Sequence, residues 1–309
     1  MEPRVEGYRP LLGLAYPAGS EAPLVVLRSF TLNGRPRWLA VDPETLTTQS
    51  TSGDGSRFEP RSWSEIRDAI GRTPYGRAID DGRTNEGAIT DAGVTHLHPG
   101  QPGVDLTVDL CPSGRPLDRR LFLALLEELS RVERPVPVAV AITGVWMRQH
   151  PADLAWLAAL NEEKSLAITW VNHSFNHRVR SDRALSSNFL LDPGTDIDEE
   201  VLGTERALLE RGLLPSVFFR FPGLVSSRAL VEHVLSLGLI PVGSDAWLAK
   251  SEWPRIGSIV LVHANGNEPL GVRRFIDLLR RERASIRQRR WVLLDLRESV
   301  VETERAPRR

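Results

Sequence analysis

The sequence lacks the cysteine content and the excess of one charge that would mark a disulfide-rich protein or a nucleic-acid-binding protein. It has one cysteine, Cys111, so an intramolecular disulfide framework is excluded, but the compartment stays open. Lys plus Arg (39) nearly balance Asp plus Glu (40), so no long-range attraction to nucleic acid or to an anionic membrane is expected. The Arg-rich run 280–290 contains no aromatic residues, which favours a solvated helix face over a nucleic-acid site.

Long apolar runs are also missing. No stretch reaches the roughly 18 to 20 residues that span a bilayer, so we predict no transmembrane segment. Residues 10–16 are apolar but too short, and too poor in flanking charge, for a signal peptide. No internal repeat and no glycine-rich phosphate loop is present.

The first hundred residues differ in character from the rest. Two strand-like segments, 23–30 and 37–41, are joined through Asn33-Gly34, a pair that favours tight hairpins because both residues tolerate positive φ. Ser/Gly-rich and polar stretches follow, with a short helix expected at 63–70. We predict an N-terminal extension containing a β-hairpin over residues 1–103.

From residue 104 onward, apolar runs alternate with helical segments. The runs are continuous, as expected for strands that are covered on both faces in a parallel sheet. Six or seven such units in about 200 residues favour a closed or nearly closed α/β barrel over residues 104–309. The expected strands are 104–110, 137–143, 165–172, 217–221, 239–243, 258–263 and 291–296, and the expected helices are 117–132, 152–163, 197–211, 227–238 and 272–283.

Polar residues stand at the carboxyl ends of these runs, where α/β barrels carry their chemistry. The sequence WVNHSFNH places two of only seven histidines four residues apart, directly after a strand, so both can converge on one ion. Unpaired burial of so many ionisable groups would be costly, which favours a functional site. The set at this rim is Asp109, His173, His177, Arg220, Asp245 and His263.

Residues 104–296 resemble the polysaccharide deacetylases of carbohydrate esterase family 4, which are also called NodB-homology domains. The family's signatures have counterparts here in the same order, and the His-Ser-x-x-His signature is matched outright. The counterparts are Thr107-Val108-Asp109-Leu110, His173-Ser174-Phe175-Asn176-His177, Arg220-Phe221-Pro222, Asp245-Ala246-Trp247 and Leu261-Val262-His263.

The resemblance implies a distorted (β/α) barrel that hydrolyses N-acetyl groups on an oligo- or polysaccharide with a divalent metal, first of all zinc, with cobalt or nickel as alternatives. It implies that His173 and His177 bind the metal and that Asp109 and His263 act as general base and general acid. Arg220 would orient Asp109, and Asp245 would pair with His263. Pro222 and Trp247 would contact substrate. The localisation it implies is periplasmic or extracellular.

One position departs from the pattern, because the family's metal-binding aspartate is replaced by Leu110, which cannot coordinate. The third ligand therefore stays open between Asp109, Cys111 and Asp118, although a lone cysteine is ordinarily a small packed residue.

Two other functions stay open with it: a catalytically silent carbohydrate-binding relative, and an amidase of the same fold that acts on a non-sugar amide. The pair His96 and His98 is interpreted as part of a solvated segment and not as a second metal site.

Overall fold

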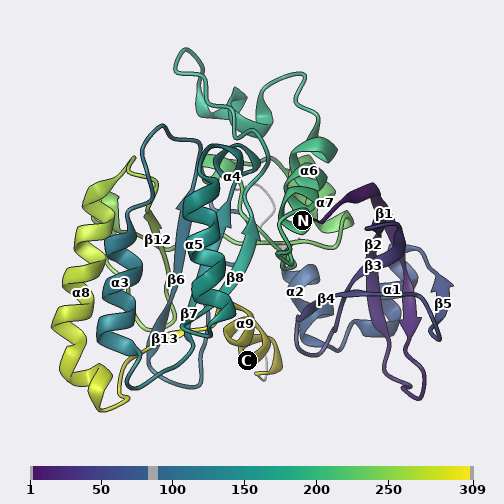
Figure 1. The fold of residues 1–309 in the computed structure, drawn as a ribbon, viewed down its shortest axis with the longest axis horizontal. Helices are drawn as coiled ribbons and strands as arrows, with labels where there is room; N and C mark the ends of the chain where they lie inside the picture. Colours follow the sequence, from purple (N-terminus) through teal and green to yellow (C-terminus); the bar gives the residue numbers. More distant parts are fainter. Residues whose placement is uncertain (1–2, 83–89, 307–309) are drawn as a thin grey trace.

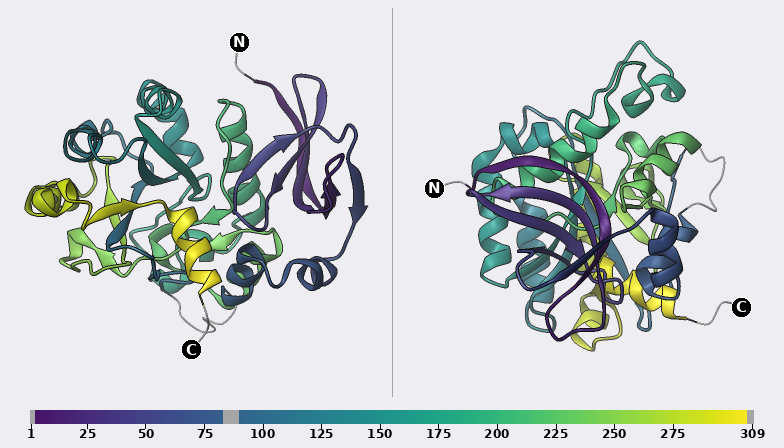
Figure 2. Two further views of the ribbon diagram at one scale, coloured as in Figure 1. Left: turned by 90° about the horizontal axis from the view of Figure 1, so that it is seen from below. Right: turned by 90° about the vertical axis from the view of Figure 1, so that its right-hand side faces the viewer.

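The computed structural model describes residues 3–82 and 90–306. Two sheets organise this part of the chain: an antiparallel sheet in the order β4-β3-β2-β1-β5, and a parallel sheet in the order β10-β9-β8-β7-β6-β12-β11, with β13 paired to β6. The antiparallel sheet lies to one side of the parallel one (Figure 1), and the left view of Figure 2 shows it as a separate curved layer.

The antiparallel sheet is larger than the predicted hairpin. Strands β2 and β3 pair through a turn at Asn33 and Gly34, whose φ values of 51° and 78° are those that the Asn-Gly pair favours. Two helices follow the sheet, and the second begins with a proline at its first turn. The elements are β1 (Val5–Tyr16), β2 (Leu24–Leu32), β3 (Arg35–Val41), β4 (Thr48–Thr51), β5 (Arg57–Pro60), α1 (Trp63–Ile70) and α2 (Pro74–Asp81).

The parallel sheet contains the seven predicted strands in the predicted order, and helices cover its outer face. It is the curled, distorted barrel that the sequence indicated. The elements are β6 (Gly103–Leu110), α3 (Arg119–Leu129), β7 (Val136–Ile142), α4 (Gly144–Gln149), α5 (Pro151–Glu162), β8 (Leu166–Asn172), α6 (Ile197–Leu209), β9 (Phe218–Phe219), α7 (Arg228–Ser236), β10 (Ile240–Pro241), β11 (Ala246–Trp247), β12 (Ile259–His263), α8 (Pro269–Arg287), β13 (Val292–Leu294) and α9 (Leu296–Arg305).

Short 3-10 helices lie in the connections between these elements: η1 (Leu185–Ser187), η2 (Phe189–Leu191), η3 (Pro222–Leu224) and η4 (Leu248–Lys250). No helix in the described ranges has the length and apolar character needed to cross a membrane.

Residues 94–96 link the two ends of the open barrel. Within the described residues β10 and β11 do not pair with each other. Instead, Val94 forms a bridge with Val242, just after β10, and His96 forms one with Ser258, just before β12. The segment before residue 103, which the sequence assigns to the N-terminal extension, therefore contributes to the barrel wall.

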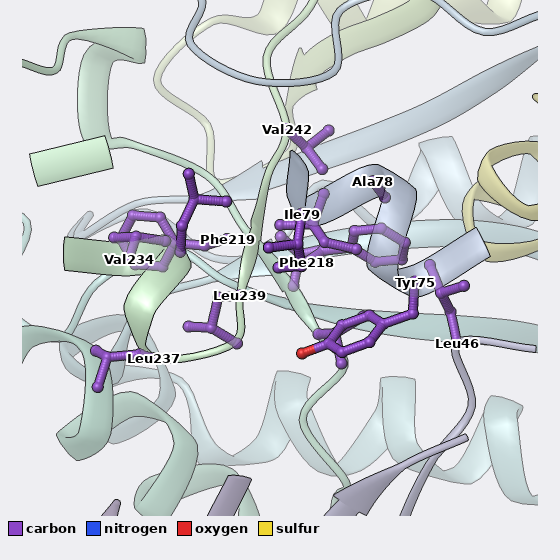
Figure 3. Close-up of a cluster of buried hydrophobic side chains, with 14 of the residues drawn as sticks. Leu46, Tyr75, Ala78, Ile79, Phe218, Phe219, Val234, Leu237, Leu239 and Val242 are labelled. Carbon is purple, nitrogen blue, oxygen red and sulfur yellow. The ribbon is translucent and has the colours of Figure 1, made fainter. Parts of the chain in front are cut away.

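A shared apolar core joins the N-terminal region to the barrel. Tyr75 and Ile79 of α2 pack with Phe218 and Leu239 of the barrel (Figure 3), and all four side chains are buried. The Tyr75 hydroxyl donates a hydrogen bond to the carbonyl of Gly238 at 2.6 Å. The two parts are thus packed together as one body.

A buried ion pair crosses the same boundary. Arg28 of β2 donates from Nε and Nη2 to the carboxylate of Glu205 on α6, at 2.8 and 3.0 Å. Its Nη1 donates to the carbonyls of Leu27 and Leu237, and the Tyr8 hydroxyl donates to Glu205. Both charged side chains are fully buried, so the ion pair is completely enclosed.

Candidate active site

A buried carboxylate and guanidinium form the base of the site. Asp109 is the penultimate residue of β6, and Arg220 directly follows β9. Arg220 Nη1 donates to Asp109 Oδ1 at 2.8 Å and to the hydroxyl of Thr107 at 2.6 Å. The remaining guanidinium nitrogens donate to the carbonyls of Val242 and Gly243. Burial opposes ionisation of Asp109, but Arg220 lowers the pKa of its carboxyl below the usual value.

Beside this pair, a thiol and two imidazoles converge. Cys111 follows β6, and His173 and His177 follow β8; one nitrogen of each imidazole and the Cys111 Sγ all lie within 4.8 Å of one another. His173 Nε2 lies 3.5 Å from Sγ and 3.6 Å from Asp109 Oδ2. The His173 Nδ1 lies 2.9 Å from the carbonyl oxygen of Arg220, which can only accept, so Nδ1 carries the proton and Nε2 presents a lone pair.

The charges within this group are strongly coupled. Burial raises the pKa of the Cys111 thiol, but the imidazoles of His177 and His173 outweigh that effect and hold it well below the usual value. Burial lowers the pKa of His177, but Cys111 outweighs this effect and raises that pKa above the usual value. His177 Nε2 is buried and has no hydrogen-bond partner among the described residues. The Cys111 thiol therefore ionises more readily than an ordinary thiol.

The strand geometry explains the roles of Leu110 and Cys111. Successive residues of a strand point to opposite faces, so Asp109 and Leu110 diverge. Leu110 is fully buried in the apolar cluster beneath the helices, whereas Cys111 again faces the histidines. Asp118 is a helix cap: its carboxylate accepts from the backbone amide of Arg120 and pairs with the Arg120 side chain. Of the three proposed third ligands, Cys111 is the one grouped with both histidines.

His263, at the end of β12, has a different partner from the predicted one. Its Nδ1 forms an ion pair with Glu268 Oε2 at 2.8 Å, and Glu268 also accepts from the Trp247 indole nitrogen at 2.8 Å. The Trp247 ring lies 5.7 Å from the His263 ring, and Lys250 Nζ lies 3.4 Å from the Trp247 ring centre. Burial lowers the pKa of His263, but contacts with Cys111 and Glu268 raise it well above the usual value.

The predicted pairing of Asp245 with His263 is wrong. Asp245 Oδ2 lies 2.8 Å from His96 Nδ1, and Oδ1 accepts from the amide of Ile259. Ala246 is in register with Val260, so Asp245 stands at the start of β12, whereas His263 stands at its end. Four residues of strand separate them by about 13 Å. The same contact makes His96 a half-buried partner of Asp245, whereas His98 is exposed as expected.

Sequence reasoning missed Glu268, because no family signature contains it. It stands five residues after His263, directly before the proline that begins α8. Pro222, predicted to contact substrate, is buried at the start of η3. Its contact with substrate stays a prediction.

No family model matches the sequence. Among solved structures, the chain is similar to Bacillus subtilis PdaA, a family 4 carbohydrate esterase, with 15% identity over 69% of this chain and 86% of that chain and a TM-score of 0.50. The chain has the family 4 carbohydrate esterase fold.

Two further structures with this fold are also similar. A family 4 carbohydrate esterase from Bacillus anthracis has 17% identity over 67% of this chain and 86% of that chain, with a TM-score of 0.49. A mutant of a family 4 pseudoenzyme from Bacillus anthracis, with restored enzymatic activity, has 13% identity over 94% and 93%, with a TM-score of 0.45.

Proposed function

We propose that the protein is a metal-dependent hydrolase that removes N-acetyl groups from a carbohydrate. The observation that carries the proposal is the grouping of Cys111, His173 and His177 beside the Asp109–Arg220 pair. The His173 Nε2 lone pair faces the Cys111 thiol, and Asp109, the proposed general base, lies beside His173. Such a set is expensive to bury unless it holds a cation.

The side chains fit a divalent metal. A thiolate and two neutral imidazoles form a three-ligand set that leaves a coordination position open, as catalytic zinc sites require. The protonated Nδ1 of His173, held by a backbone carbonyl, is the arrangement found behind metal-binding imidazoles. Sulfur and nitrogen ligands favour zinc, with cobalt and nickel as workable replacements. We therefore assign Cys111 as the third ligand in place of the carboxylate missing at Leu110.

The residues around this group divide the proton transfers. A bound divalent ion would polarise the amide carbonyl and lower the pKa of water. Asp109 accepts the proton of the attacking water at Oδ2, since Oδ1 is held by Arg220. His263 donates a proton to the leaving amine nitrogen, and Glu268 stabilises the imidazolium that makes this donation possible. Trp247, fixed by Glu268, lines the sugar side of His263.

The substrate we propose is an N-acetylated oligo- or polysaccharide. Such substrates belong to the periplasm or the cell exterior, where we place the activity by the resemblance to the deacetylase family.

Acetate release from N-acetylglucosamine oligomers tests this function. The purified protein is assayed with added Zn²⁺ or Co²⁺, and a chelated sample is run in parallel. Release that disappears with the chelator is the expected result. A folded protein that binds metal but releases no acetate from these oligomers would contradict the proposal, and release from non-sugar N-acetyl amides alone would favour an amidase of the same fold.

The assignment of Cys111 has its own measurement. Co²⁺ bound to a thiolate shows a charge-transfer absorption in the near ultraviolet. We expect this band in the native protein and its loss in Cys111→Ser. A band that persists in the variant would exclude Cys111 as a ligand.

A silent carbohydrate-binding protein is the second candidate, and the buried Leu110 favours it because the usual ligand position is filled by core packing. Retained glycan binding with no metal bound and no acetate released would establish it.

A further inference from the structure

The loop that carries the two histidines has an unfavourable backbone. Ser174 and His177 have φ values of 66° and 48°, in the left-handed region that non-glycine residues seldom adopt. Residues in this region are strained and persist only where neighbouring groups fix them. Something beyond the loop itself must therefore hold it.

Glu200, near the start of α6, bonds to the centre of this loop. Its Oε2 accepts from the backbone amides of Phe175 at 2.9 Å and Asn176 at 2.8 Å. Its Oε1 accepts from the Asn176 side-chain amide at 2.9 Å. One carboxylate thus fixes two of the three residues between the two histidines.

The strand end and α4 hold the loop from the other sides. Asn172 Oδ1 accepts from the amide of Ser174, and its Nδ2 donates to the carbonyl of Val201 on α6. The Phe175 ring packs so closely on Gly144 that a Cβ there would lie 2.0 Å from the ring. These contacts leave the loop amides facing α6, where Glu200 is the charged acceptor.

The charge of Glu200 is itself unusual. The residue is only 4% exposed, and no Lys or Arg among the described residues forms an ion pair with it. A buried carboxylate without a cation is costly, and its place in the first turn of α6 offsets only part of that cost. The three N–H donors that bond to it all belong to the histidine loop. A neutral residue would be the cheaper choice for packing alone.

We propose that Glu200 is a positioning residue that holds the loop in the conformation in which His173 and His177 reach one metal ion. The inference rests on the proposed metal site and adds a residue to it that no family signature contains. The carboxylate acts through the loop geometry, because it bonds to the two residues that directly precede His177.

The experiment compares Zn²⁺ affinity, measured by competition with a chromophoric chelator, in the native protein and in Glu200→Gln. The variant keeps the side-chain size but offers only one acceptor oxygen. We expect affinity to fall about 10- to 100-fold, the usual cost of losing a group that orients a ligand. Glu199→Gln is the matched control on the same turn of α6, since its side chain is exposed and pairs with Arg206; its affinity should stay native.

Hydrogen exchange supplies a metal-free measurement. In the apo protein the amides of Phe175 and Asn176 should exchange faster in Glu200→Gln than in the native protein, while amides elsewhere in α6 should not. If Glu200 contributed only to stability, Glu200→Gln would lower the melting temperature without changing Zn²⁺ affinity, and this result would contradict the proposed positioning role.

Asn176→Ala tests the same contact from the loop side should Glu200→Gln not fold. It removes one of the three bonds and should weaken Zn²⁺ binding severalfold. The proposal would be overturned if a folded Glu200→Gln or Asn176→Ala variant bound Zn²⁺ with native affinity and its loop amides exchanged at the native rate. A native protein that binds no Zn²⁺ but shows the expected exchange difference would refute the metal site while leaving the bracing role in place.

Discussion

Two buried arginines in this protein make the same kind of bond and have different consequences. Arg28 joins the N-terminal sheet to α6 through Glu205, and Arg220 joins β9 to β6 through Asp109. Both guanidinium groups are essentially inaccessible, and both also donate to backbone carbonyls. The carboxylates differ: both oxygens of Glu205 are bonded, whereas Asp109 Oδ2 faces His173 at 3.6 Å.

That difference separates the ion pair that only joins two elements from the one that we propose to be catalytic. A carboxylate whose two oxygens are both occupied can only hold two elements together. Asp109 has one oxygen fixed by Arg220 and the other turned toward His173, so it keeps its orientation and can still accept a proton. The distinction can be tested by removing one member of each pair.

The largest effect is expected from Asp109→Asn. The amide keeps an oxygen for Arg220 but cannot accept a proton, so acetate release should fall about 10³-fold, within the range for loss of a general base. Metal content, measured on the same sample, should remain native. Activity within tenfold of native would remove Asp109 from the role of base.

Arg28→Met should act on stability instead. It leaves Glu205 buried with the Tyr8 hydroxyl as its remaining partner, and breaking a buried pair in this way costs about 3 kcal/mol or more. Urea unfolding measures the loss. The double variant Arg28→Met/Glu205→Met should recover part of it, and a double variant less stable than the single one would argue against an uncompensated charge as the cause.

Asp105 gives a smaller effect that depends on pH. It lies on β6 four residues before Asp109, but its described partner is the Ser299 hydroxyl and no arginine reaches it. Burial raises its pKa to about 8. Because the native state holds this proton and the unfolded state releases it near pH 4, the free energy of unfolding should fall as pH rises from about 4 to about 8.

Asp105→Asn should remove that dependence. At pH 8.5 the variant should melt at least about 3 °C above the native protein, the shift produced by roughly 2 kcal/mol in a chain of this length. Equal melting temperatures across the pH range would show that Asp105 ionises normally in the folded protein.

The smallest effect is expected from Glu268→Gln. The carboxylate is about one third exposed, so its support of the His263 imidazolium is screened and worth roughly 1 kcal/mol or less. The rate of acetate release at saturating substrate should fall about threefold to fivefold. Asp245→Asn is the control, because Asp245 pairs with His96, and it should leave that rate near native.

Much of the barrel could be predicted from the sequence because its strands are buried on both faces. Continuous apolar runs marked all seven predicted strands, although β9 and β10 are only two residues long. The strand β1 was not predicted: its register with β2 shifts between Glu6 and Arg9 and again between Pro10 and Gly13, so the alternation typical of a strand is broken. The two-residue β11 is too short to leave any pattern.

The sequence predicted those site residues that stand at the carboxyl end of a predicted strand. His173 and His177 share one loop, so their grouping follows from the sequence. Asp109 and Arg220 also stand at strand ends, but β7 and β8 lie between β6 and β9 in the sheet, so the curl of the sheet brings these two side chains together. The predicted pairing of Asp245 with His263 was wrong because β11 aligns with the start of β12 and not with its end. The register between two strands cannot be read from their residues alone.

By itself the sequence determined the order of strands and helices, and it placed the two histidines and Asp109 at one rim, because burial on both faces and strand-end position are local properties. Only the tertiary structure decided that Glu268 partners His263, that Cys111 joins the histidines in place of Leu110, and that Glu200 holds their loop. These contacts join residues 5 to 66 positions apart, and they depend on register and packing between elements that no local pattern records.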